Sequence, residues 1–364
     1  MITKAAVTHG KGQPFQIEDI SIERPKTGEV LIRMVASGMC HTDLIVRDQH
    51  FPVPLPAVLG HEGSGVVELV GDGVTSIKPG DHVVLTFSSC GTCSSCHNAK
   101  PYACETFFGL NFGGKMVDGS HRLHVSGQKI STFFGQSSFA YYSVCSERNV
   151  VKVPNDVALD ILGPLGCGIQ TGCGAVFNKL KPEAGSSVAI FGCGSVGLSA
   201  IMAAKLVGCT RIIAVDVQDN RLELAKELGA THVINPHRSN PLEEIYKIAE
   251  KGVNYSLETS GRAEVLRQAV DCLAVLGTAA VIGAPPLGTE VSLDIKTLRS
   301  ERTVTGVVEG SSVPHTFIPQ LVELYKNGLL PIDKLITFYS LEEINQASED
   351  MEKGISIKPV IKYI

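Results

Sequence analysis

The sequence predicts a two-domain α/β protein, in which a mostly antiparallel β domain is followed by a doubly wound domain built on a parallel sheet. The first part, to about Val153, holds short β-branched runs broken by Gly, Pro and Asp, a pattern typical of antiparallel strands. From about Thr171, apolar strands alternate with helical periods, which is typical of a parallel sheet with crossover helices. The 364 residues are enough for two domains of ordinary size.

The elements follow this division. In the first domain, strands are expected at 29–35, 65–70 and 81–85. In the second, strands are expected at 187–191, 211–215, 253–258 and 278–283, with helices at about 196–207, 221–228 and 263–273. One more helix, at about 318–326, and a last strand, at 357–361, are expected to pack back on the first domain. We therefore predict one domain from 1–168 and 309–364, and a second from 169–308.

Composition excludes several classes of partner. The chain is 44% hydrophobic and 19% charged, with a formal net charge of −5, so nothing favours a nucleic acid or a membrane surface. The N-terminal residues lack the apolar run of a secretory signal, and no uninterrupted apolar stretch reaches about 18 residues. We expect a cytoplasmic protein whose partner is a small molecule. A sheet-edge strand near 303–308 would favour a homo-oligomer, either a dimer or a tetramer.

Four of the eleven cysteines are closely spaced inside a Gly/Ser-rich loop. Their pattern, Cys-x2-Cys-x2-Cys-x7-Cys, fits a closed tetrahedral zinc site with four thiolate ligands. Disulfides are disfavoured in a reducing cytosol, and the last gap is longer than in the bacterial ferredoxin motif. We therefore predict a structural zinc bound by Cys90, Cys93, Cys96 and Cys104.

Cys40, His61 and Cys167 each lie among glycines or small residues, as a crowded metal site requires. Taken singly, each is more often a buried core residue than a ligand. Together, two thiolates and one imidazole would leave a tetrahedral zinc with one open position. The spacing does not show that the three side chains converge. The remaining cysteines are interpreted as small buried hydrophobes, namely Cys145, Cys173, Cys193, Cys209 and Cys272.

A dinucleotide motif follows the strand predicted at 187–191. Gly192, Gly194 and Gly197 form G-x-G-x-x-G between that strand and a helix, so that the backbone can approach a pyrophosphate at the helix N-terminus. Asp216 closes the next strand, where a carboxylate accepts hydrogen bonds from the adenosine ribose and repels a 2′-phosphate. NAD is therefore favoured over NADP. Arg221 is a candidate to cover the adenosine end, with a solvated helix-face charge as an equal alternative.

These motifs, in this order, resemble the zinc-dependent medium-chain alcohol dehydrogenases over essentially the whole chain. Within that family, the runs from Phe51 to Gly65 and from Phe107 to Phe112 are similar to those of bacterial aryl-alcohol (benzyl-alcohol) dehydrogenases. The resemblance implies a GroES-like catalytic domain, a Rossmann domain, NAD as the coenzyme and two zinc ions per chain, one catalytic and one structural.

The resemblance also implies roles around the catalytic zinc. Cys40, His61 and Cys167 would bind the ion, Glu62 would lie behind it, and Asp43 would accept the second ring N–H of His61. Such a carboxylate fixes the tautomer and the orientation of a histidine ligand.

Further positions match the family's proton relay and coenzyme site. Thr42 matches the hydroxyl that passes the alcohol proton toward the nicotinamide ribose. Thr171 and Val196 fall where the family contacts the nicotinamide, and Ile282 is assigned to the same cofactor site. Lys358 falls where a basic residue meets the pyrophosphate.

The chain departs from the family at the end of the relay. In the animal and yeast branches a histidine lies three residues after the relay hydroxyl, whereas here that residue is Ile45. His41, His50 and Arg47 are the candidates to replace it, and His41 is the first to test. The arginine that the formaldehyde/glutathione branch carries after its fourth zinc-loop cysteine is also missing, which speaks against that substrate.

The predicted function is the reversible oxidation of a primary aryl alcohol to the aldehyde, in which a zinc-bound alkoxide gives hydride to NAD. A terpene alcohol such as geraniol is the alternative substrate, and a non-catalytic zinc-binding relative is a remote one. Five apolar side chains could form the walls of the pocket, although each has a core-packing interpretation: Phe51, Phe87, Phe107, Phe112 and Ile282.

Overall fold

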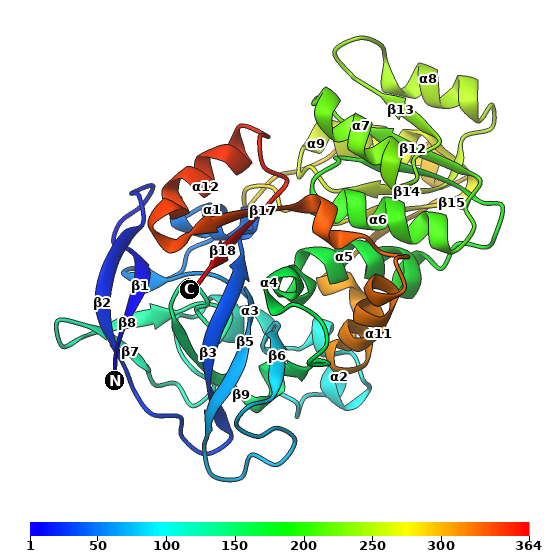
Figure 1. Ribbon diagram of the computed structural model, residues 1–364. Coiled ribbons are helices and arrows are strands. Elements are labelled where there is room, and N and C mark those ends of the chain that lie inside the picture. The colour runs from blue at the N-terminus through cyan, green and yellow to red at the C-terminus, as the bar shows by residue number, and fades with distance from the viewer. Residues whose placement is uncertain (364) are drawn as a thin grey trace. The chain divides into compact units, whose positions relative to one another are not determined.

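A computed structural model describes residues 1–363, which divide into two compact units. The first unit comprises Met1–Gly168, Val313–Lys326 and the C-terminal segment from Ile332 onward. The second comprises Ile169–Ser312 and Asn327–Pro331. Figure 1 shows strands gathered in the first unit and alternating helices and strands in the second.

Two β-sheets make up the first unit. A closed barrel has the strand order β1-β2-β7-β8-β4, formed by Ile2–Thr8, Gln16–Ile22, Leu123–Val125, Gln128–Thr132 and Ala57–Val58. The second sheet has the order β10-β6-β5-β3-β18-β17, formed by Val150–Lys152, His82–Leu85, Glu62–Val70, Glu29–Gly38, Lys358–Lys362 and Ile336–Ser340. A further strand, β9 (Tyr142–Ser146), pairs with β3. Most neighbours are antiparallel, and one hydrophobic core contains buried residues of both sheets.

The helices of this unit lie between strands and range from 4 to 13 residues. They are α1 (His41–Arg47), α2 (Ser94–His97), α3 (Phe107–Phe112), α4 (Leu159–Leu162), α11 (Pro314–Lys326) and α12 (Ile344–Glu352). Helix α11 begins four residues before the start predicted from the sequence. Proline is favoured at a helix start because its missing N–H has no partner there in any case, so Pro314 opens the helix without cost.

Three strand ends meet in the second sheet, and this meeting positions the candidate site. The end of β3 pairs with the start of β5, with Gly38 opposite Glu62. On its other side Gly38 lies opposite Val360 of β18. Figure 1 shows the corresponding strands, blue and red, side by side. Residues just beyond Gly38, just before Glu62 and at the start of β18 are therefore brought together from distant parts of the chain.

The second unit holds a six-stranded parallel sheet. Its order is β13-β12-β11-β14-β15-β16, formed by His232–Ile234, Arg211–Val215, Ser187–Phe191, Val253–Glu258, Leu273–Val281 and Thr303–Gly306. Its helices are α5 (Gly168–Gly174), α6 (Ser195–Leu206), α7 (Asp219–Leu228), α8 (Pro241–Ile248), α9 (Ala263–Asp271) and α10 (Ile295–Leu298). In chain order this is the 3-2-1-4-5-6 arrangement of a Rossmann fold. The predicted α/β class is confirmed.

Most predicted elements are present within a residue or two. The strands expected at 187–191, 211–215 and 253–258 have those bounds. The helix expected at 263–273 ends at Asp271, and β15 already begins at Leu273, so its start was missed. A register shift where β14 pairs with the beginning of β15 accompanies this difference. Within residues 1–363, no helix is both long enough and apolar enough to span a membrane.

Candidate active site

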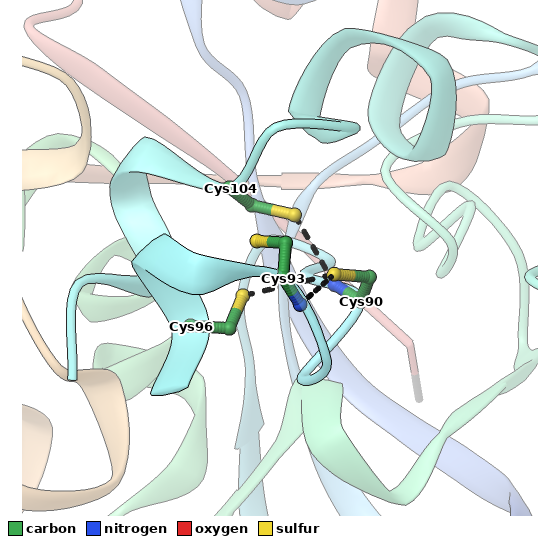
Figure 2. A group of neighbouring side chains, drawn as sticks. All are labelled: Cys90, Cys93, Cys96 and Cys104. Carbon is green, nitrogen blue, oxygen red and sulfur yellow. Dashed lines mark hydrogen bonds between the residues drawn. The ribbon is translucent and has the colours of Figure 1, made fainter. Parts of the chain in front are cut away.

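The four closely spaced cysteines converge. The Sγ atoms of Cys90, Cys93, Cys96 and Cys104 all lie within 4.8 Å of one another. Figure 2 shows the four side chains pointing toward a common centre. Cys90 Sγ and Cys96 Sγ are 3.9 Å apart, far beyond the length of a disulfide bond. A tetrahedron with metal–sulfur bonds of about 2.3 Å has edges of roughly 3.8 Å. The donor set therefore fits a tetrahedral zinc.

Backbone amides in this loop stabilise a thiolate at Cys90. Hydrogen bonds from the backbone N–H groups of Thr92 and Cys93 reach Cys90 Sγ at 3.4 and 3.3 Å. The amide of Thr92 is the main cause that lowers the pKa of Cys90 to about 5. A thiolate is the form of cysteine that binds metal. All eleven cysteines, which lie within the described residues, are free of disulfide bonds.

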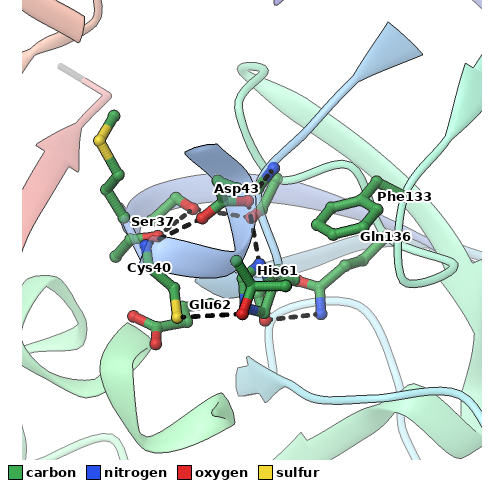
Figure 3. Close-up of polar contacts among 12 residues, drawn as sticks. Ser37, Cys40, Asp43, His61, Glu62, Phe133 and Gln136 are labelled. Carbon is green, nitrogen blue, oxygen red and sulfur yellow. Dashed lines mark hydrogen bonds and ion pairs between the residues drawn. The ribbon is translucent and has the colours of Figure 1, made fainter. Parts of the chain in front are cut away.

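The second set of predicted ligands also converges. Cys40 immediately precedes α1, His61 immediately precedes β5, and Cys167 immediately precedes α5. Their donor atoms, together with a carboxylate oxygen of Glu62, lie within 4.8 Å of one another. Figure 3 shows Cys40, His61 and Glu62 gathered at one point. A hydrogen bond with Cys167 is the main cause that lowers the pKa of Cys40 well below its usual range, against the effect of burial.

The environment of His61 fits a metal ligand. The imidazole is fully buried, and its Nδ1–H donates to Asp43 Oδ1 at 2.9 Å. Its Nε2 is buried and has no hydrogen-bond partner among the described residues. A buried polar atom without a partner is costly, and a metal ion satisfies it. Asp43 also accepts the backbone N–H groups of Cys40 and Gly60, at 2.9 and 3.0 Å, so its carboxylate is fixed.

Behind these donors lies an ion pair of two fully buried side chains. Lys358 Nζ donates to both carboxylate oxygens of Glu62 at 2.9 Å and to the carbonyl oxygen of Met39 at 3.1 Å. Its side chain is 1% exposed. The sequence predicted a pyrophosphate contact for Lys358, and that contact stays a prediction. It would require Nζ to exchange one of these three partners.

Three residues around His61 were missed by the sequence analysis. The buried Gln136 side-chain amide donates to the carbonyl oxygens of His61 and Thr86, at 3.0 and 3.2 Å. The rings of Phe133 and Phe134 pack on the imidazole, with centroids 5.4 and 4.6 Å away. No local pattern marks these positions, because they are brought to His61 by tertiary folding.

The proposed relay residues lie on α1, except His50, which follows this helix. Thr42 Oγ1 is 3.7 Å from Cys40 Sγ, and Thr42 is half-buried. His41, at the first position of the helix, is exposed, as is His50. The Arg47 guanidinium is bound to Asp48, Ser348 and Glu352, which leaves it less suited than the exposed histidines to exchange protons.

The glycine motif in the second unit has the geometry of a phosphate-binding turn. Gly192 has φ +96°, and a Cβ at Gly197 would lie 1.8 Å from the Gly192 carbonyl oxygen, so both positions need glycine. Helix α6 follows with no side-chain cap at Gly194. Its first N–H groups are thus available to an anion. The amide of Cys193 donates to Asp216 Oδ2 at 2.6 Å, which holds the carboxylate beside the turn.

Apart from Lys358, the other predicted coenzyme residues lie in the same unit. Arg221 Nη1 is 4.0 Å from Asp216 Oδ2, and its Nε is buried without a hydrogen-bond partner among the described residues. The Arg221 side chain is 21% exposed, and both interpretations of this residue stay predictions. Thr171 on α5 is buried, and Val196 is in the first turn of α6. Ile282 follows β15 at the carboxyl edge of the sheet, where such folds bind ligands.

Two family models of known proteins match this sequence, one in its N-terminal part and one in its second part. Residues 26–155 match the family model described as an alcohol dehydrogenase GroES-like domain, and residues 195–327 match that of a zinc-binding dehydrogenase. The chain belongs to the zinc-dependent medium-chain alcohol dehydrogenase family, as the resemblance predicted. It is an alcohol dehydrogenase by family, and the cofactors of that family are NAD and zinc.

Individual relatives act on different alcohols. The geraniol dehydrogenase of Castellaniella defragrans is 46% identical over 364 residues, which cover 99% of this chain and 97% of that protein. The crystal structure of benzyl alcohol dehydrogenase from Acinetobacter calcoaceticus is 52% identical, with a TM-score of 0.97 and 100% of both chains covered. That of an alcohol dehydrogenase zinc-binding domain protein from Burkholderia ambifaria is 52% identical, with a TM-score of 0.98, and covers 100% of this chain and 99% of that one.

Proposed function

We propose that this chain is an NAD-dependent aryl-alcohol dehydrogenase, which reversibly oxidises a benzyl-type primary alcohol to its aldehyde. The observation that carries the proposal is the convergence of Cys40, His61 and Cys167, with His61 Nε2 buried and unpartnered among the described residues. These three residues would hold the catalytic zinc, and the four-cysteine loop would hold the structural zinc. The zinc-binding domain would comprise 1–168 and 309–364, and the coenzyme-binding domain 169–308.

When bound, the zinc supplies Lewis-acid chemistry that lowers the pKa of an alcohol hydroxyl, and NAD supplies the hydride acceptor. The chain's own residues orient and move the proton. Asp43 holds the His61 ring so that Nε2 faces the ligand cluster. Thr42 takes the hydroxyl proton at Oγ1 and passes it on, and His41, exposed beside it, exchanges it with solvent.

The coenzyme would be held in the second unit. Gly192, Gly194 and Gly197 leave room for the pyrophosphate at the start of α6. The Asp216 carboxylate accepts hydrogen bonds from the ribose hydroxyls, and the Arg221 guanidinium covers the adenosine end of the coenzyme. Thr171, Val196 and Ile282 contact the nicotinamide side.

Replacing Asp216 with serine should lower kcat/KM for NAD by about 10- to 100-fold, because hydrogen bonds to a charged acceptor contribute about 1.5–3 kcal/mol. The NAD-to-NADP preference should fall at least as far, since the repulsion of a 2′-phosphate is also lost. Steady-state kinetics with both coenzymes measure this. Glu223→Gln, which neutralises an exposed carboxylate on α7, is the control. An unchanged preference would show that Asp216 does not contact the ribose.

Aromatic side chains in the first unit support a flat, apolar substrate. Phe112 contacts Phe51, Phe133 and Phe134, with ring centroids 5.9, 5.7 and 5.2 Å away, and Phe134 in turn packs on His61. A continuous set of rings therefore reaches the ligand cluster. Aromatic pairs of this kind favour edge and offset contacts with a further ring.

A panel of alcohols tests the substrate. Benzyl alcohol should give the highest kcat/KM, and ethanol the lowest, because ethanol leaves most of the apolar contact unmade. Geraniol is the second candidate, favoured by the 46% identity to a geraniol dehydrogenase. A higher kcat/KM with geraniol would move the assignment to terpene alcohols, and ethanol as the best substrate would overturn both. Absence of any alcohol-dependent NADH formation would favour a non-catalytic relative.

We also propose that the protein acts in the cytoplasm as a homo-oligomer, either a dimer or a tetramer. Strand β16 lies at one end of the sheet order, and among residues 1–363 it pairs with β15 alone. An edge strand offers unpaired backbone groups to a second copy. Light scattering of the purified chain at micromolar concentration gives the mass that decides this.

A further inference from the structure

Lys358 is a buried cation of the first unit that the proposed reaction does not use. It opens β18 near the C-terminus, and its ammonium has three hydrogens to donate. All three have acceptors within the unit: Glu62 Oε1, Glu62 Oε2 and the Met39 carbonyl oxygen. Burial alone would lower the pKa of Lys358, but the Glu62 carboxylate outweighs it and raises the pKa. The lysine is therefore charged and fully engaged.

The two residues that accept hydrogen bonds from Lys358 are each adjacent in sequence to a proposed zinc ligand. Met39 precedes Cys40, and Glu62 follows His61. The segment of the third proposed ligand, Cys167, also contacts the Glu62 carboxylate. Gly168, which follows Cys167, donates its N–H to Glu62 Oε1 at 3.0 Å. Three segments that are far apart in the sequence are thus tied to one ion pair.

The space around Glu62 admits little movement of the carboxylate. A Cβ at Gly38 would lie 2.1 Å from Glu62 Oε2, so that residue's lack of a side chain makes room for the pair. Glu62 and Lys358 side chains are 0% and 1% exposed. Removing one member of a buried ion pair strongly destabilises the folded protein, because it leaves the other charge buried without a partner.

We propose that the Glu62–Lys358 pair is a clamp that holds the segments of Cys40, His61 and Cys167 in position for zinc. Lys358 is then a positioning residue of the metal site. The inference rests on the proposed function, because it takes these three residues as the zinc ligands.

The test is zinc release from the full chain into a chelator, followed with a metal indicator dye. Loss of a residue that supports a ligand from behind typically costs about 10- to 100-fold in metal affinity. In Lys358→Met, one zinc equivalent should leave about 10- to 100-fold faster than in the wild-type chain. The second equivalent, in the four-cysteine loop, should leave at the wild-type rate and so serves as an internal control for folding.

Three further variants sharpen the result. Lys358→Arg keeps a charged donor for Glu62 and should restore slow release. Lys362→Met, on the same strand but paired with the half-exposed Asp160, should behave as wild type. In the double variant Glu62→Gln with Lys358→Met, no buried charge is left unpaired. This double variant should fold as stably as the wild-type chain. It still lacks the hydrogen bond to the Met39 carbonyl oxygen, so zinc release should stay about tenfold faster than in the wild-type chain.

NAD affinity separates the two roles of Lys358. The dissociation constant of NAD, measured by fluorescence for Lys358→Met, shows separately whether Lys358 also contacts the coenzyme. Wild-type zinc release in Lys358→Met or in the double variant would overturn the clamp, and a large loss of NAD affinity with normal release would leave Lys358 as a coenzyme contact only. If the wild-type chain bound only one zinc, the proposed function itself would be wrong, and this result does not depend on the variants.

Discussion

Replacing Cys40 with serine should lower kcat/KM for alcohol oxidation by about a thousandfold or more and reduce the zinc content from two per chain to one. A Lewis-acid metal contributes several kcal/mol to the transition state, and each 1.36 kcal/mol is tenfold in rate. Serine lacks the thiolate that Cys40 offers, and its loss leaves His61 and Cys167 as an incomplete ligand set. Elemental analysis and NADH absorbance on the same preparation measure both effects.

The control for this variant is a cysteine outside both clusters. Cys209→Ala removes a buried thiol of the second unit that belongs to neither donor set. It should keep two zinc ions and nearly full activity. If Cys40→Ser also kept two zinc ions and most of its activity, the three-residue site would not be the catalytic one.

Replacing Thr42 with alanine should lower kcat/KM by about 100- to 1,000-fold without loss of zinc. Positioned proton transfer contributes about 10²–10⁴-fold in enzymes generally. Thr42 Oγ1 lies 3.7 Å from Cys40 Sγ, so its hydroxyl is next to the place where the alcohol oxygen would bind. Kinetics on variants with verified zinc content measure the effect.

Thr42→Ser keeps the hydroxyl on the same backbone and should retain most of the activity. A decrease of less than about threefold in Thr42→Ala would exclude the relay. Equal losses in the alanine and serine variants would instead point to packing of the threonine methyl group.

Features set by local sequence were predictable, and features set by tertiary folding were not. The turn from β11 into α6 follows from three glycines whose spacing and context suffice, and the structure shows the positive φ at Gly192 that this turn needs. The four-cysteine loop is similarly local, because its ligands lie within fifteen residues of one another in the sequence. The start of β15 was missed because the sequence there continues the apolar pattern of α9.

Convergence of Cys40, His61 and Cys167 depends on strand register. It requires Gly38 to lie opposite Glu62, a pairing between strands that no spacing in the sequence reveals. The position of Lys358 is a stronger case. Its place in the family pattern predicts a coenzyme contact, and that contact stays a prediction. The ion pair of Lys358 with Glu62 comes from the fold, in which β18 pairs with β3, and no local sequence pattern indicates it.

The most direct test is a crystal structure of the chain with zinc and NADH, with anomalous data at the zinc edge. The account predicts a peak about 2.3 Å from the sulfurs of Cys40 and Cys167 and about 2.0–2.1 Å from His61 Nε2. The open side of that ion should face the reactive carbon of the nicotinamide ring. No peak among these three side chains, or an ion closed off from the coenzyme, would contradict it.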